Sequence, residues 1–137
     1  MPVAPIPAGQ IERFWPVAAP LLAPAIARAQ GDWQADDVHA ALLARDLQLW
    51  LWLNDDGIAT AAGVTTIDVR PRRAVCVVMF LGGRDRSSWQ EEALDTITTW
   101  ARAEGCTAIE GHGRPGWLRV LRNTAWRTTT HTLRQEF

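Results

Sequence analysis

An unbroken apolar run, AVCVVMFL at residues 74–81, is the feature that most constrains the fold of this chain. Because the run has no polar alternate face, it predicts a strand that is covered on both sides at the centre of a sheet. Gly82 and Gly83 then predict a turn, since glycine has no Cβ to restrict the backbone. Residues 88–91, Ser-Trp-Gln-Glu, have the capping-box pattern of a helix start. A helix start beside a strand end exposes unpaired backbone N–H groups, so we expect this junction to accommodate an anion.

The composition predicts one soluble globular domain over residues 1–137, with residues 1–10 as an extended lead-in. Of the 137 residues, 47% are hydrophobic and 21% charged, which is enough apolar material for a sizeable core. The net charge of −1 gives no strong attraction to nucleic acid or to an anionic membrane. Residues 1–30 have no basic-then-apolar leader, and the uncharged stretch 14–27 is too short to span a bilayer. We therefore expect a cytoplasmic protein that is not membrane-associated.

Cys76 and Cys106 are the only cysteines, and neither has a partner at metal-ligand spacing. Each falls in a stretch that we predict to be a buried strand. We therefore expect two buried thiols in a reducing compartment, although adjacent strands could bring them close together. The sequence predicts no metal site.

The N-terminal third predicts two helices. Apolar residues keep roughly helical spacing over residues 11–29, but Pro16, Pro20 and Pro24 would each remove an intrahelical hydrogen bond, so we expect a broken or short helix. Asp32 is predicted to cap the next helix, at residues 33–45.

Residues 47–83 predict an antiparallel meander of three strands. Residues 47–53 alternate, with leucines on one face and Trp50 and Trp52 on the other. Asn54-Asp-Asp-Gly57 is a hairpin turn pattern, and residues 58–69 form the returning strand with a kink at residues 61–63. Trp50 and Trp52 are either covered by a helix or form an exposed aromatic patch for a partner.

The C-terminal part predicts a parallel β-α-β unit. A helix at residues 88–104 is followed by a strand at residues 106–110, which implies a right-handed crossover to a parallel neighbour. A short helix at residues 115–121 and an edge strand at residues 126–137 complete the prediction. The expected fold class is α+β, in three layers: a mixed sheet with helices on both faces.

This order of elements resembles the GNAT family of N-acetyltransferases from about residue 11 to residue 137. Residues 100–106 and the stretch Glu-Gly-His-Gly-Arg-Pro-Gly-Trp at residues 110–117 also resemble small GNAT-like proteins encoded by tailed phages. The family sheet is covered on both faces, which favours burial of the two tryptophans. The resemblance also implies that acetyl-CoA lies between the central strand and the following parallel strand. Its pyrophosphate would lie on a loop of pattern Gln/Arg-x-x-Gly-x-Gly/Ala, whose first position here is Arg84 and whose small positions are Ser87 and Trp89.

The resemblance assigns the pantetheine arm to the strand backbone and the phosphates to the loop that follows it. The cofactor-binding residues it implies are Val78, Met79, Phe80, Leu81, Gly82, Gly83, Arg84, Arg86, Ser87 and Ser88.

Glu110 and His112 are the candidate catalytic residues. Many members of the family protonate the leaving thiolate with a tyrosine, but this chain contains none. A general base could be Glu110 or His112, since both lie near the end of the predicted parallel strand. Glu110 could instead be a structural partner of Arg114 or of a loop backbone group. His112, between two glycines, could be a turn residue.

Three functions follow as hypotheses. The first is acetyl transfer from acetyl-CoA to a small-molecule or protein amine. The second is a GNAT-fold binding or assembly protein without catalysis, which would contact a phage structural protein and lie in the host cytoplasm or the virion. The third is a nucleic-acid-associated regulator, for which the sequence offers only Arg119, Arg122, Arg127 and Arg134. A free sheet edge at residues 126–137 also makes a homo-oligomer an open alternative.

Overall fold

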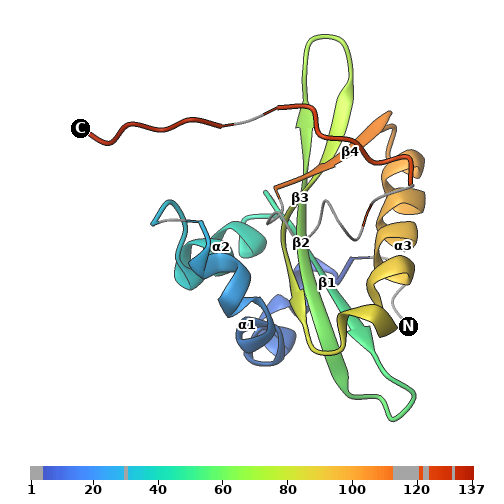
Figure 1. Cartoon of the computed structure of the whole chain (residues 1–137). Coiled ribbons are helices and arrows are strands. Elements are labelled where there is room, and N and C mark those ends of the chain that lie inside the picture. Colours follow the sequence, from blue (N-terminus) through green and yellow to red (C-terminus); the bar gives the residue numbers. More distant parts are fainter. Residues whose placement is uncertain (1–4, 30, 113–120, 122–123, 131) are drawn as a thin grey trace.

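A computed structural model describes residues 5–29, 31–112, 121, 124–130 and 132–137 of the protein. A mixed sheet in the order β1-β2-β3-β4 forms its centre (Figure 1). The first three strands are antiparallel neighbours, whereas β4 pairs parallel with β3, so the predicted fold class is confirmed. The elements are α1 (Ile11–Ala27), α2 (Ala35–Leu43), β1 (Gln48–Leu53), β2 (Ala59–Val69), β3 (Ala74–Gly83), α3 (Gln90–Ala103) and β4 (Ala108–Gly111), with short 3-10 turns η1 (Ala8–Gln10) and η2 (Arg86–Ser88).

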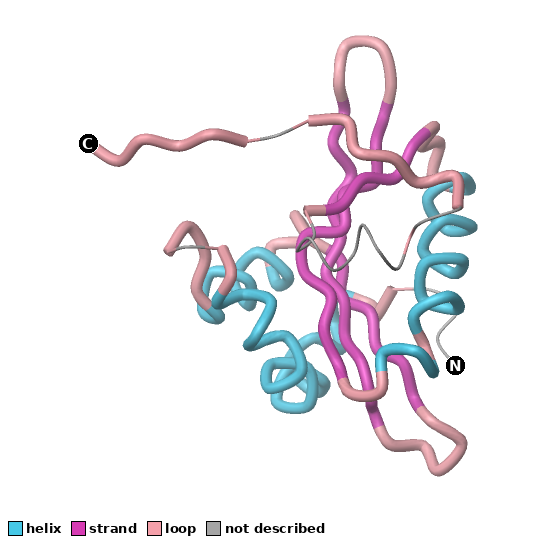
Figure 2. The backbone as a smooth tube through the Cα atoms, viewed as in Figure 1, coloured by secondary structure: helices cyan, strands magenta, loops and turns pink. Residues whose placement is uncertain are grey.

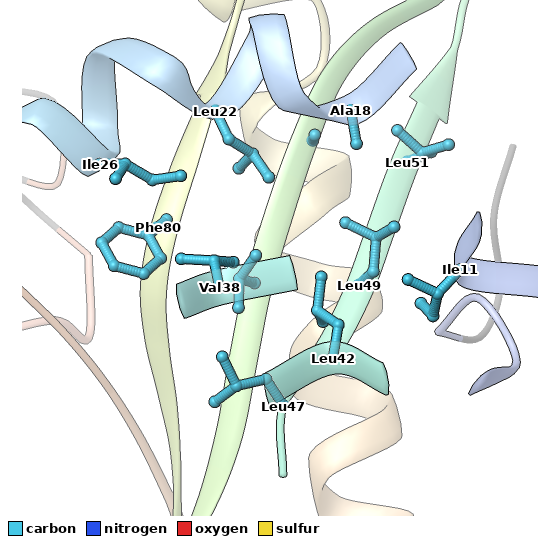
Figure 3. Close-up of a cluster of buried hydrophobic side chains, with 12 residues drawn as sticks. Ile11, Ala18, Leu22, Ile26, Val38, Leu42, Leu47, Leu49, Leu51 and Phe80 are labelled. Carbon is cyan, nitrogen blue, oxygen red and sulfur yellow. The ribbon is translucent and has the colours of Figure 1, made fainter. Parts of the chain in front are cut away.

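Helices cover both faces of the sheet, with α1 and α2 on one face and α3 on the other (Figure 2). The alternation of β1 sends its leucines to the first face and its tryptophans to the second. Figure 3 shows the leucine cluster, which consists of Ile11, Ala18, Leu22, Ile26, Val38, Leu42, Leu47, Leu49, Leu51, Ala62, Val64 and Phe80. The tryptophan cluster consists of Trp50, Trp52, Ala61, Cys76, Val78, Trp89, Ala93, Ile97, Ala101 and Cys106. Burial of the two β1 tryptophans under a helix is therefore confirmed.

Helix α1 is continuous, so the prediction of a broken or short helix is wrong. Its three prolines are four residues apart, and all are exposed on one side of the helix. The carbonyl groups that lose a partner at each proline can therefore be solvated by water. The opposite side carries the buried residues that hold the helix on the sheet, which are Ile11, Ala18, Leu22 and Ile26. Packing of this apolar stripe offsets the poor helix propensity of proline.

The start of α2 differs from the prediction. Asp32 does not cap the helix. The helix begins after Gln34, whose backbone N–H donates a hydrogen bond to Asp37 Oδ2 (2.9 Å). Asp32 is used elsewhere, because it accepts a hydrogen bond from Arg134 in the C-terminal tail (2.5 Å).

The described part of the C-terminal tail, residues 124–130 and 132–137, forms no strand, so the predicted edge strand is wrong for these residues. The last part of the tail extends away from the sheet (Figure 1), and its contact with the body includes the Arg134–Asp32 ion pair. Leu133 and Phe137 are fully exposed on it. Strand propensity alone does not form a strand when the segment does not pair with a neighbouring strand. The helix predicted at residues 115–121 lies, apart from Leu121, outside the described residues.

Candidate functional site

A β-bulge in the centre of β3 shapes the candidate site. Val64 of β2 pairs with Phe80 and the next residue, Thr65, pairs with Val78, so Met79 is an extra residue on β3. A bulge shifts the alternation of side chains along a strand. Accordingly, Val78 lies in the tryptophan cluster, whereas Phe80, two residues later, lies in the leucine cluster on the opposite face.

The pairing between β3 and β4 ends at this bulge. The register runs from Val75 opposite Ala108 to Val78 opposite Gly111, the last residue of β4. Residues 79–83 of β3 therefore have no strand partner on the β4 side within the described ranges. In the described part of the chain no strand pairs with these residues along that edge, and an unpaired strand edge can bind an extended ligand.

Gly82 and Gly83 are the last residues of β3 and do not form the turn that the sequence predicted. Neither has a positive φ; the left-handed residue after the strand is Asp85, with a φ of 52°. The glycines instead allow close packing. A Cβ at Gly82 would lie 2.5 Å from the backbone oxygen of Leu21 in α1, and one at Gly83 would lie 2.4 Å from the oxygen of Thr60. The end of β3 therefore fits between α1 and β2 only without side chains.

Polar groups of the loop after β3 form hydrogen bonds within the protein. The Arg84 N–H donates to the Thr60 carbonyl (2.9 Å), and the Ser88 N–H donates to the Asp85 carbonyl (2.8 Å). The hydroxyl of Ser88 also donates to the Asp85 carbonyl (2.7 Å), so the capping box predicted at residues 88–91 does not form. The N–H groups of Arg84 and Ser88 are consequently not free for an anion.

Trp89 closes the base of this loop. Its side chain is only 4% exposed and packs in the tryptophan cluster, with its ring 6.4 Å from that of Trp52. Its indole N–H donates to the Arg84 carbonyl (2.7 Å). The residue at the last small position of the family pattern is therefore a structural anchor between the loop and the sheet.

Carboxylates surround the start of α3. A hollow of about 420 Å³ on its outer side is lined by Ser87, Ser88, Glu91, Glu92, Asp95 and Thr96. Glu91 and Glu92 lie in the first turn, where they stabilise the positive end of the helix themselves. An anionic ligand at Ser87 and Ser88 would be repelled by these carboxylates. It would be attracted by Arg84, which is exposed in the preceding loop.

Glu110 is held by an arginine that sequence reasoning did not identify. Arg70 donates two parallel hydrogen bonds to it, from Nη1 to Oε2 (3.0 Å) and from Nη2 to Oε1 (2.8 Å). Arg70 Nε also donates to Asp68 Oδ2 (2.9 Å). The hydrogen bonds from Arg70 lower the pKa of Glu110, and the pKa of Arg70 is raised in return. The predicted partner of Glu110, Arg114, lies outside the described residues.

The β3–β4 register brings the predicted base residues beside the predicted cofactor strand. Glu110 pairs with Val77, and Gly111 pairs with Val78, one residue before the bulge. His112 follows directly and is exposed. The lowered pKa makes Glu110 a weaker base than an ordinary carboxylate. Of the two candidates, His112 is the one without a described ion pair.

Cys76 and Cys106 are buried and unpaired, as predicted. Burial raises the pKa of the Cys76 thiol to about 12 and also raises that of Cys106, so neither is a ready nucleophile. Within the described ranges no group of histidine, cysteine and acidic residues could hold a metal ion. Among the same residues, none of the helices combines the length and the hydropathy needed to cross a bilayer.

The sequence matches no protein-family model and no curated protein, whereas several solved structures resemble its fold. A ribosomal-protein-alanine N-acetyltransferase from Brucella melitensis superimposes with a TM-score of 0.64 at 18% identity, covering 96% of this chain and 98% of the other. A GNAT family acetyltransferase from Staphylococcus aureus gives 0.66 at 8% identity, with coverages of 98% and 96%. An aminoglycoside acetyltransferase from an uncultured soil metagenomic sample gives 0.67 at 8% identity, with coverages of 98% and 95%. Together with the mixed sheet and its partly open β3–β4 pair, these similarities establish that the chain has the GNAT fold.

Proposed function

We propose that the protein binds acetyl-CoA along the open edge of β3 and transfers the acetyl group to an amine. The observation that carries this proposal is the bulge at Met79 together with the end of β3–β4 pairing at Gly111. Two structural neighbours, an aminoglycoside acetyltransferase and a ribosomal-protein-alanine N-acetyltransferase, are enzymes of acetyl transfer, which supports the proposal. When bound, the cofactor supplies an activated thioester.

The described residues fit the arm of acetyl-CoA better than its pyrophosphate. Backbone groups of residues 79–81 have no β4 partner among the described residues and could bond the amide groups of the arm, whereas Val78 pairs with Gly111. The following loop offers Arg84 and Arg86 as cations, but the N–H groups of Arg84 and Ser88 are already used within the protein. We therefore propose that side-chain charge, rather than a cradle of N–H groups, holds the phosphates.

His112 is the base that we favour for removing the proton from the incoming amine, because Arg70 already holds the carboxylate of Glu110. Glu110 then acts as a positioning residue, since its ion pair with Arg70 links β4 to the turn between β2 and β3. Both roles rest on the proposed acyl transfer.

A second candidate is a GNAT-fold protein that binds or assembles without catalysis, in a phage or prophage setting. The observations that favour it are the closed loop at Trp89 and the carboxylates at the start of α3, both of which oppose pyrophosphate binding.

Calorimetric titration of the full chain with acetyl-CoA separates the two candidates. The enzyme proposal expects binding, slower amide exchange at residues 79–81 when the cofactor is added, and unchanged exchange in β1. It also expects release of free thiol with an aminoglycoside or a peptide amine as acceptor, which His112→Ala slows while cofactor binding persists. Absence of heat at millimolar acetyl-CoA would reject the enzyme proposal and leave the binding protein.

A further inference from the structure

The loop after β3 points its first N–H group away from the open edge of β3. In the sheet, β2 lies on one side of β3 and β4 on the other. The N–H of Arg84 donates to the Thr60 carbonyl of β2 (2.9 Å), whereas the open edge of β3 is on the β4 side. A ligand that continued from this edge toward the loop would therefore not meet the Arg84 N–H group.

Four further donors of this loop are also used within the protein. The N–H and the hydroxyl of Ser88 both donate to the Asp85 carbonyl (2.8 and 2.7 Å). The N–H of Trp89 donates to the Arg86 carbonyl (3.3 Å), and its indole N–H donates to the Arg84 carbonyl (2.7 Å). A cradle for a pyrophosphate needs several N–H groups that point at one anion. These donors are directed at the loop's own carbonyl groups instead.

The loop and the first turns of α3 together carry a negative charge. Residues 84–95 contain two arginines and four acidic residues, which gives a formal net charge of −2. The acidic residues are Asp85, Glu91, Glu92 and Asp95. Three of these carboxylates line the hollow beside the loop. Arg84 and Arg86 can orient a phosphate group, but the carboxylates offset the attraction, so phosphates add little to affinity.

The open edge of β3 suits the pantetheine arm of the donor without its nucleotide. Residues 79–83 are an extended segment that spans about 16 Å and has no β4 partner among the described residues. Alternate residues of a strand present N–H and C=O groups to the same edge, so an extended chain with secondary amides can pair there. A pantetheine arm is a chain of this kind. Because the arm is uncharged, the carboxylates of α3 do not oppose its binding.

We propose that the protein recognises its acyl donor by the pantetheine arm and not by the nucleotide, so that any acyl thioester of pantetheine is a substrate. This inference rests on the acetyl transfer proposed above and defines its donor. The reaction is unchanged: the C–S bond of the thioester breaks, a C–N bond to the amine forms, and the amine proton ends on the released thiol. Two kinds of molecule carry such an arm, coenzyme A and a protein with phosphopantetheine on a serine.

Calorimetric titration of the full chain compares acetyl-CoA with S-acetylpantetheine, which has the same thioester arm but no nucleotide and no phosphate. The two dissociation constants are expected to agree within about threefold. Glu91→Gln removes a carboxylate beside the loop, so it should tighten acetyl-CoA binding about twofold and leave S-acetylpantetheine binding unchanged. Glu104→Gln removes the same charge at the other end of α3 and should change neither.

Acetyl-CoA binding that is at least about thirtyfold tighter than S-acetylpantetheine binding would overturn the inference and leave the proposed acetyl transfer intact. No heat with either donor at millimolar concentration would instead reject the proposed function itself. Thiol release from an acetylated carrier protein, compared with acetyl-CoA at equal concentration, identifies the source of the arm. Faster release from the carrier protein indicates a protein partner, and faster release from acetyl-CoA indicates the free coenzyme. Either order is compatible with recognition of the arm, because both donors share it.

Discussion

Arg70 holds Glu110 through two parallel hydrogen bonds although the two residues are 40 positions apart in the sequence. The pair joins the turn after β2 to the last part of β4, the short strand that ends where the open edge of β3 begins. A planar guanidinium facing a carboxylate in this way fixes both position and orientation. The location of β4 beside β3 thus depends on a contact made outside the sheet hydrogen bonds.

The ion pair predicts a loss of stability in acid. Because the folded-state pKa of Glu110 is lowered by Arg70, its contribution is present above the unfolded pKa and is lost as the pH falls through the folded pKa. Glu110→Gln should therefore show a smaller decrease in Tm than the wild type between pH about 7 and 3. An unchanged acid profile in Glu110→Gln would contradict this role. Arg70→Gln should also return the pKa of Glu110, measured by NMR, toward its ordinary value.

Gly82→Ala is expected to destabilise the protein because the added Cβ meets the backbone oxygen of Leu21, which cannot move independently of α1. The expected loss in the free energy of unfolding is about 1–3 kcal/mol, measured by urea denaturation. Gly9→Ala is the control, since a Cβ there has no neighbour within 4 Å. Equal stability of the two variants would show that α1 does not pack tightly against the end of β3.

Trp89→Phe isolates the hydrogen bond from the indole to the Arg84 carbonyl while keeping most of the ring packing. We expect a loss of about 1 kcal/mol and faster amide exchange in residues 84–88. Ser88→Ala, which removes an exposed hydrogen bond to Asp85, should change stability less. The reverse order of the two variants would mean that the loop is held by its own turn and not by Trp89.

The prolines of α1 predict a stabilising substitution. Pro20→Ala restores an intrahelical hydrogen bond at an exposed position and should raise the free energy of unfolding by about 1 kcal/mol. Ala23→Pro, also exposed and in the same helix, should lower it by more, because it adds a fourth proline off the existing row. If Pro20→Ala lowers Tm, the row of prolines contributes to the folded state in a way that helix hydrogen bonding does not explain.

The raised pKa values of the two thiols predict that native protein reacts slowly with a thiol reagent. Cys76, with a pKa of about 12 and no exposed surface, should react only when the protein unfolds. Comparing Cys106→Ser with wild type, native and in denaturant, measures Cys76 alone. Rapid labelling of native Cys106→Ser would show that α3 opens from the sheet.

Local patterns allowed much of this fold to be predicted. The alternation at residues 47–53 predicted β1, its two faces and the burial of Trp50 and Trp52, because a period of two depends only on neighbouring residues. The apolar run at residues 74–81 predicted a central strand because a run without a polar face indicates cover on both sides. The order of elements was then sufficient to predict the parallel position of β4.

Features set by three-dimensional context were missed. The proline spacing in α1 suggests disruption until it is known that all three prolines face water. The bulge at Met79 depends on the register with β2, and no residue type in this stretch predicts a bulge. Arg70 reaches Glu110 across the fold, and Gly82 and Gly83 form a strand end because α1 and β2 approach them. The candidate base and cofactor residues remain predictions on a fold that is established.

Three rings of the tryptophan cluster and Trp100, which packs against the cluster, form one connected row. Trp50 stacks on Trp52 at 6.2 Å and meets Trp100 edge to face at 5.4 Å, while Trp52 continues the row to Trp89. Indole rings held in fixed, asymmetric contacts of this kind contribute to circular dichroism in the near ultraviolet, and the signal depends on the geometry of the contacts. Two of the four belong to β1 and the other two flank or lie in α3. The near-ultraviolet circular dichroism of this protein should therefore report whether α3 is packed on the sheet.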